Sequence, residues 1–236
     1  GISFLNLMNH TSGLPRLPNN LKIKNVRQPY ENYSENDLYA YLKTCTPKPD
    51  GKSNYSNLGV GLGGVLAERI AGITYAQLLD KYIFLPFKMV TEANSVASSN
   101  NNSQGYYAKD DKTPFWNMNV LAPAGGLKCS GSEMLSYLQN LCFPQTAFSK
   151  QIIDELTTQT VSINNNIAVG RGWHILLKKD EQPVYWHNGG TYGFSTFCAF
   201  VKDSSSAVMI VINQTGKNSV SDLIGITILK RMLSEK

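Results

Sequence analysis

The first half of the chain carries apolar residues at helical spacing. Between Asn57 and Gly72 they recur every three or four positions, and the final glycine is a typical helix stop. The apolar positions that share one face are Leu58, Leu62, Val65, Leu66 and Ile70. Glycines at 59, 61, 63 and 64 each lower helix propensity by up to about 1 kcal/mol relative to alanine. We therefore predict a buried helix that packs closely against a neighbouring backbone.

Capping boxes predict further helices. A Ser or Thr followed three residues later by Asp, Glu or Gln occurs at Ser34, Thr74 and Ser130, each time ahead of an amphipathic run. A similar start at Ser219 precedes Leu223 and predicts a helix that closes the chain.

The pattern changes after residue 165. Runs rich in β-branched and aromatic residues are separated by polar turns, which predicts an antiparallel meander. The predicted strands cover 169–177, 184–187, 194–201 and 207–213. Helices followed by strands and a closing helix favour an α+β fold. We predict a mainly helical region over 1–165 and a second region over 166–236 that holds the antiparallel strands and the C-terminal helix.

Residues 91–119 show neither helical nor strand periodicity and are rich in Asn and Ser. We predict a long surface loop. Its aromatic residues Tyr106, Tyr107, Phe115 and Trp116 either fasten the loop to the body of the protein or line a substrate groove, and we favour the first reading.

The composition is that of an ordinary globular chain, with 236 residues and 42% hydrophobic residues. The net charge of +5 comes without a run of Lys or Arg, which argues against a nucleic-acid partner. The four cysteines form no C-x-x-C pair and the three histidines lie at no metal-ligand spacing, so we assign no metal and no cofactor. No apolar run reaches the roughly 18 residues of a membrane-spanning helix, so we expect no membrane span.

Four motifs follow one another along the chain: His10-Thr11-Ser12-Gly13-Leu14-Pro15, Tyr55-Ser56-Asn57, Ala124-Gly125-Gly126-Leu127 and His187-Asn188-Gly189-Gly190-Thr191-Tyr192-Gly193-Phe194. In this order they resemble the class C β-lactamase-related serine hydrolases, a family that includes β-lactamases, D-alanyl-D-alanine carboxypeptidases, D-aminopeptidases and lactamase-like esterases. The resemblance spans nearly the whole chain. It implies an α+β fold of the β-lactamase/transpeptidase type.

The resemblance also implies catalytic roles. Tyr55 would take the proton of a nucleophilic serine, which a phenol of ordinary pKa near 10 does at neutral pH only if positive neighbours favour its phenolate. In the family these neighbours are the Lys of an S-x-x-K motif and a Lys or His of the last motif, here His187. Asn57 would hold that Lys and bind the substrate amide.

The last motif would also bind the substrate. Glycines at 189 and 190 let the strand edge approach closely, and the N–H of Gly190 would be one of two oxyanion-hole donors. Asn188 stands where the family usually has Thr or Ser at a substrate carboxylate. A histidine in place of the Lys of β-lactamases resembles the carboxypeptidase, aminopeptidase and esterase branches, which argues against efficient β-lactam hydrolysis.

The nucleophile of the family is not found in the chain, because no S-x-x-K occurs in the sequence. Ser12 lies in a turn signature, and neither Ser56 nor Ser195 stands in a G-x-S-x-G elbow. We expect that the nucleophile helix and the first strands belong to an N-terminal segment of the same protein that this chain lacks. The chain as given is then inert.

The resemblance implies a serine hydrolase that acts through an acyl-enzyme on D-amino-acid peptides, β-lactams or small esters, in the periplasm or outside the cell. The alternative is a non-catalytic relative that binds peptidoglycan-like or peptide ligands in the same groove. The combination of Tyr55, Asn57 and His187 argues for the enzyme, because a protein that only binds has no need of a tuned phenol. A purely structural module predicts a core without a cleft and has little in its favour.

Overall fold

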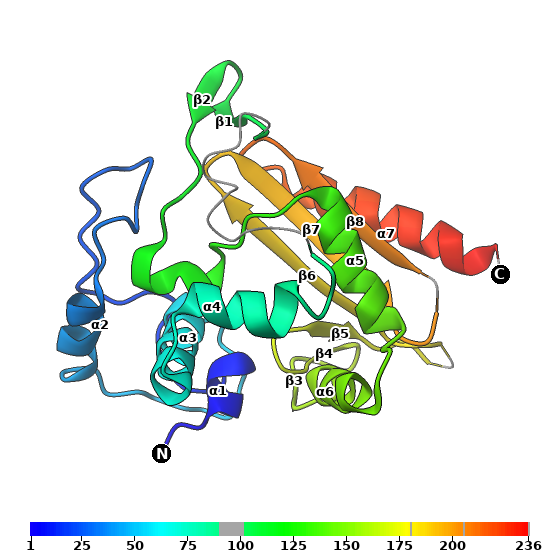
Figure 1. Ribbon diagram of the computed structural model, residues 1–236, viewed down its shortest axis with the longest axis horizontal. Helices are drawn as coiled ribbons and strands as arrows, with labels where there is room; N and C mark the ends of the chain where they lie inside the picture. The colour runs from blue at the N-terminus through cyan, green and yellow to red at the C-terminus, as the bar shows by residue number, and fades with distance from the viewer. Residues whose placement is uncertain (90–101, 180, 205, 236) are drawn as a thin grey trace.

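The computed structural model describes residues 1–89, 102–179, 181–204 and 206–235 (Figure 1). Helices and a large antiparallel sheet form the molecule, which confirms the predicted α+β class. The helical elements are α1 Phe4–Met8, α2 Glu35–Leu42, α3 Asn57–Ala71, α4 Tyr75–Leu79, the π-helix η1 Asp80–Phe84, the 3₁₀-helix η2 Asn119–Ala124, α5 Gly131–Cys142, α6 Ala147–Thr157 and α7 Asn218–Ser234. The strands are β1 Gly105–Ala108, β2 Asp111–Thr113, β3 Val161–Ser162, β4 Ile167–Val169, β5 His174–Leu176, β6 Val184–Thr191, β7 Phe194–Val201 and β8 Ala207–Ile212.

The main sheet runs in the order β3-β4-β5-β6-β7-β8, with every neighbouring pair antiparallel. Strand β7 is buried on both faces because its side chains alternate between two cores. Phe197 packs with Leu229 of α7, and Phe200 packs with Leu138 of α5. The sheet therefore lies between α5 on one face and α7 on the other, as the ribbon shows (Figure 1).

Helix α3 is the centre of the helical region and follows the sequence prediction closely. Ser56 is its N-cap, and Gly72 ends it in the left-handed conformation at φ 68°. A Cβ on Gly61 would lie 2.7 Å from Leu121 of η2, and one on Gly64 would clash with the ring of Pro123. The glycines thus let η2 approach the helix backbone, which confirms the predicted close packing.

The capping boxes predicted at Ser34, Thr74 and Ser130 are all present. The predicted start of the last helix at Ser219 is wrong, because α7 begins at Asn218 after Lys217, which makes no side-chain cap. The strand predicted over 169–177 is also wrong. A turn through Gly172, at φ 89°, divides that run into β4 and β5.

Part of the predicted 91–119 loop has regular structure. Residues 105–113 form the hairpin β1-β2, while 90–101 lie outside the described residues. Phe115 stacks on Phe194 with ring centroids 5.1 Å apart, and Trp116 contacts Tyr192 at 5.0 Å. These rings fasten the segment to the end of the last motif.

Separate hydrophobic clusters support the helical region and the sheet. The first surrounds Leu38, Leu58 and Leu121, whereas α5 and α6 share the cluster of the sheet strands. The boundary proposed at residue 165 concerns domain organisation and stays a prediction. No helix in the described part of the chain is long and apolar enough to cross a membrane.

Candidate active site

Tyr55 lies immediately before α3, where several hydrogen bonds fix the backbone. The hydroxyl of Ser56 accepts from the N–H of Gly59 at 2.9 Å and donates to the carbonyl of Pro15 at 2.7 Å. The Ser56 N–H in turn donates to Nδ1 of His10 at 3.2 Å. The first motif therefore holds the second, and the side chain of Tyr55 is half-buried.

His187 lies in β6 at the point where the sheet opens. β5 pairs with β6 only as far as Trp186, whereas β7 pairs with β6 through to Thr191. From His187 onward, the side of β6 that faces away from β7 therefore has no strand beside it within the described residues. The strand is longer than the predicted 184–187 and carries the glycines of the last motif along this open edge.

The structure brings Tyr55 and His187 together. Their ring centroids are 6.2 Å apart, although the residues come from different regions of the fold. His10 packs against Tyr55 at 4.4 Å, and His174 of β5 lies 5.6 Å from His187. Two histidines thus contact the phenol, and the third, His174, lies against His187 in the same cluster.

Burial keeps the three histidines neutral at pH 7. Desolvation is the largest effect in each case, and it lowers the pKa of His10 and of His174 from 6.5 to about 4. The pKa of His187 is also lowered by burial, and its Nδ1 donates to the carbonyl of Asn188 at 2.7 Å. The expectation that His187 supplies positive charge at neutral pH is not supported; the ring instead offers a free Nε2 lone pair.

Burial acts on the phenol in the opposite sense. It raises the pKa of Tyr55 above 10, and the Arg16 guanidinium, 5.0 Å from the ring centroid, partly offsets this. Tyr55 is therefore protonated at pH 7 in the described site. It can donate a hydrogen bond as it stands, and it needs further positive charge before it can accept a proton.

The glycines of the last motif are held by α7. Asn218 donates to the carbonyl of Gly189 at 2.6 Å, and Asn188 donates to Asp222 at 2.8 Å. A Cβ on Gly190 would lie 2.8 Å from Asn218, so only glycine fits there without displacement. The amide of Asn188 is thus used within the protein, while Gly190 itself is exposed.

Asn57 is the first residue of α3 and is half-buried. Its side chain makes no hydrogen bond to any residue that the structure describes. It is therefore free to bind a group from outside the described chain, which is compatible with the role expected for it.

The serines considered as nucleophiles are sequestered. Ser12, Ser56 and Ser195 are at most 2% exposed. The hydroxyl of Ser195 donates to the carbonyl of Gln214 at 2.8 Å, and that of Ser12 accepts from Leu14. None of them is placed for attack on a substrate.

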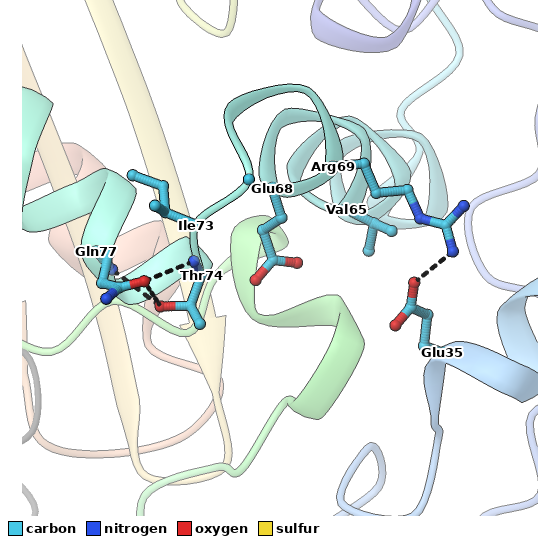
Figure 2. A pocket seen from close by; sticks show the side chains of 8 residues that line it. Glu35, Val65, Glu68, Arg69, Ile73, Thr74 and Gln77 are labelled. Carbon is cyan, nitrogen blue, oxygen red and sulfur yellow. Dashed lines mark hydrogen bonds and ion pairs between the residues drawn. The ribbon is translucent and has the colours of Figure 1, made fainter.

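A separate pocket of about 350 Å³ lies between α2, the end of α3 and the start of α4 (Figure 2). Glu68 lines it, and the ion pair between Arg69 and Glu35 spans 3.1 Å at its side. Neither Tyr55 nor His187 lines this pocket, so we do not assign it to the active site. Across the described ranges no three His, Cys, Asp or Glu side chains are grouped to hold a metal ion, and the four cysteines are present as thiols rather than in disulfides.

Sequence reasoning missed four residues of this site. Arg16 and His174 reach the site only through tertiary packing. Asn218 and Asp222 of α7 support it through hydrogen bonds to β6. The one sequence signal for these missed residues was that the chain has few histidines, all of which lie in one cluster in the structure.

Comparison with known proteins finds relatives that match over most of this chain. The profile of the β-lactamase family matches residues 1–229. A β-lactamase of Providencia stuartii is 23% identical, with 90% of this chain and 62% of the relative covered. The D-alanyl-D-alanine-carboxypeptidase/endopeptidase AmpH of Escherichia coli K12 is 24% identical, with 91% and 59% covered. This chain thus spans about three fifths of the length of these relatives.

The fold itself is found among solved structures. The class C β-lactamase of Rhodobacter sphaeroides superposes with a TM-score of 0.76 at 17% identity, over 96% of this chain and 72% of the other. This match confirms the predicted β-lactamase/transpeptidase-like fold.

Proposed function

Because this chain belongs to the β-lactamase family, we propose that the protein is a serine hydrolase whose nucleophile is supplied by residues outside this chain. Its substrates are D-amino-acid peptides, β-lactams or small esters. The observation that supports this most directly is the 6.2 Å approach of the Tyr55 and His187 rings at the open edge of β6. The names of the relatives, a β-lactamase and a D-alanyl-D-alanine carboxypeptidase, agree with these substrates.

In the proposed reaction the lysine of the nucleophile motif supplies the additional positive charge that Tyr55 needs to react as a phenolate. The serine oxygen attacks the substrate carbonyl carbon while the serine proton passes to this phenolate, which becomes the neutral phenol. The carbonyl oxygen becomes an oxyanion that accepts a hydrogen bond from the N–H of Gly190. Collapse of this intermediate breaks the bond to the leaving group, which takes the proton from Tyr55. Water then attacks the acyl-enzyme by the same sequence and releases the acid and the free serine.

The remaining candidate residues position these groups. Asn57, with its free side chain, would bind the lysine of the nucleophile motif and the substrate amide. His187 is neutral, so it would act as a hydrogen-bonding group beside Tyr55 rather than as a fixed charge. Asn188 would keep Gly189 and Gly190 in place through Asp222.

We propose the N-terminal segment of the same protein as the partner that completes the site. Several surfaces support this: the open edge of β6, the outer edge of β8, and apolar side chains that α7 exposes to solvent. These exposed side chains are Val220, Leu223, Ile224, Ile226 and Ile228. The periplasmic or secreted location remains a proposal from the family resemblance.

The coding sequence upstream of Gly1 gives the first test. An open frame that encodes S-x-x-K supports the enzyme, and a start codon at this point supports the non-catalytic relative. The second test is kinetic. The extended protein is expected to hydrolyse a chromogenic ester, a β-lactam or a D-Ala-D-Ala peptide, while the 236-residue chain, verified by intact mass, does not. Hydrolysis by the short chain would overturn the proposal, and reversible binding without acylation by the extended protein would favour the alternative.

A further inference from the structure

The ionisable groups around Tyr55 differ in the charge that they carry at neutral pH. His10, Arg16 and His187 face its ring, at 4.4, 5.0 and 6.2 Å, and His174 lies behind His187. The three histidines are neutral at pH 7 because they are desolvated. A guanidinium is charged at every pH at which proteins fold. Arg16 is therefore the permanent cation in this cluster of described residues.

The chain fixes Arg16 to the same turn that carries Tyr55. The Arg16 carbonyl accepts a hydrogen bond from the N–H of Leu58 at 3.2 Å, and the preceding Pro15 carbonyl accepts one from Ser56 at 2.7 Å. Both donors lie within three residues of Tyr55 in sequence. The guanidinium forms no ion pair with any carboxylate that the structure describes, so no neighbouring anion cancels its charge.

Building on the proposed function, we propose that Arg16 is a positioning residue whose guanidinium stabilises the Tyr55 phenolate during proton transfer. A cation over an aromatic ring is attracted to the neutral phenol only through the ring quadrupole, but it attracts a phenolate through a full opposite charge. The difference favours the charged form of Tyr55. The charge remains when the histidines are neutral, so this effect persists at neutral pH.

The Arg16 guanidinium shifts the pKa of two phenols in the same direction. Burial raises the pKa of Tyr55, and Arg16 lowers it. The same guanidinium lowers the pKa of Tyr30, which burial and Tyr192 raise. Tyr30 is 8% exposed and lies in the helical core, so it serves as a second reporter that takes no part in the proposed chemistry.

The test is a pH titration of the Tyr55 phenol in the 236-residue chain, by NMR of tyrosine labelled with ¹³C at Cζ. Tyr55→Phe assigns the resonance, and Tyr30→Phe assigns that of Tyr30. Arg16→Gln is expected to raise the pKa of Tyr55 by at least about half a unit, the effect of a unit charge roughly 5 Å away in bulk water. Arg16→Glu raises it further, and Arg16→Lys keeps it near the wild-type value.

A matched control is Arg69→Gln. Arg69 also lies over a tyrosine, at 4.5 Å from the Tyr39 ring, but far from the site in the pocket of Figure 2. This variant is expected to leave the Tyr55 titration unchanged. The exposed side chain of Arg16 makes all three substitutions compatible with folding, which ¹H–¹⁵N spectra at each pH verify.

The proposal is supported if the pKa of Tyr55 is lowest in the wild type and Arg16→Lys, higher in Arg16→Gln and highest in Arg16→Glu. Equal titration curves for the Gln, Glu and Lys variants, or an equal shift from Arg69→Gln, would overturn it. The titration needs no nucleophile and no substrate. A failure here is therefore distinct from a failure of the proposed function, which would show as absence of acylation in the extended protein.

Discussion

His10 makes the stability of this fold sensitive to acid. Its ring is 5% exposed, and its Nδ1 accepts the Ser56 N–H that holds the Tyr55 turn. A protonated ring has no lone pair for this bond. His10→Asn removes the titration and keeps an acceptor oxygen, and asparagine tolerates the left-handed backbone found here at φ 63°.

The magnitude follows from the pKa of the ring in the two states. Burial lowers it from 6.5 to about 4, so between these values the unfolded chain binds more protons than the folded one. The stability from His10 is complete above pH 6.5 and is lost as the pH falls toward 4. Proton linkage gives a loss of about 2 kcal/mol at pH 5 and about 3 kcal/mol at pH 4.

The assay is urea unfolding followed by circular dichroism at pH 7.5, 6.5 and 5.0. We expect the wild-type chain to lose about 2 kcal/mol more than His10→Asn between pH 7.5 and 5.0. His174 is present in both chains, so its own titration cancels in the comparison. Parallel losses in the two chains would refute the reasoning, because His10 would then not be a neutral buried acceptor.

Three further predictions concern the site and its support. Tyr55→Phe in the extended protein is expected to lower the rate of hydrolysis by about 100-fold or more, with an unchanged unfolding curve. Gly190→Ala places a methyl group 2.8 Å from Asn218 and is expected to lower the free energy of unfolding, measured in urea, by about 1–3 kcal/mol. The same substitution is expected to slow acylation in the extended protein. Gly225→Ala on α7 places a methyl group against the ring of Phe197 in β7 and is expected to lower the free energy of unfolding by about 1–3 kcal/mol. Gly131→Ala, which has open space around it, is expected to raise that free energy by roughly 0.5–1 kcal/mol through α5. Thermal unfolding measures both variants.

The helices were predictable because their signals are local. A capping serine and its partner three residues later specify a helix start without reference to the rest of the chain, as at Ser34 and Ser130. The start of α7 has no such signal, since Lys217 provides no side-chain cap. At this end the Asn218 side chain is instead bonded to β6, a contact that no local pattern contains.

Strand lengths were less predictable because pairing overrides propensity. Gly189 and Gly190 are poor strand formers, yet β6 continues through them because β7 pairs opposite at Thr196 and Ser195. The run 169–177 reads as one strand in sequence, but its glycine-containing turn separates two.

The motifs indicated Tyr55 and His187, and the structure places them together. Their charge state was beyond sequence reasoning, because it depends on how deeply each ring is buried. Arg16 and His174 belong to the site for the same reason. Neither stands in a pattern that marks it, and both reach the cluster through packing between segments distant in sequence.

The central claim is that Tyr55, His187 and the Gly190 edge surround an acylated hydroxyl that residues 1–236 do not provide. A crystal structure of the extended protein trapped with an acylating inhibitor tests it most directly. We expect the acyl group on a serine outside these residues, beside Tyr55, with its carbonyl oxygen about 3 Å from the N–H of Gly190. An acyl group on any residue of this chain, or one remote from Tyr55 and His187, would contradict the account.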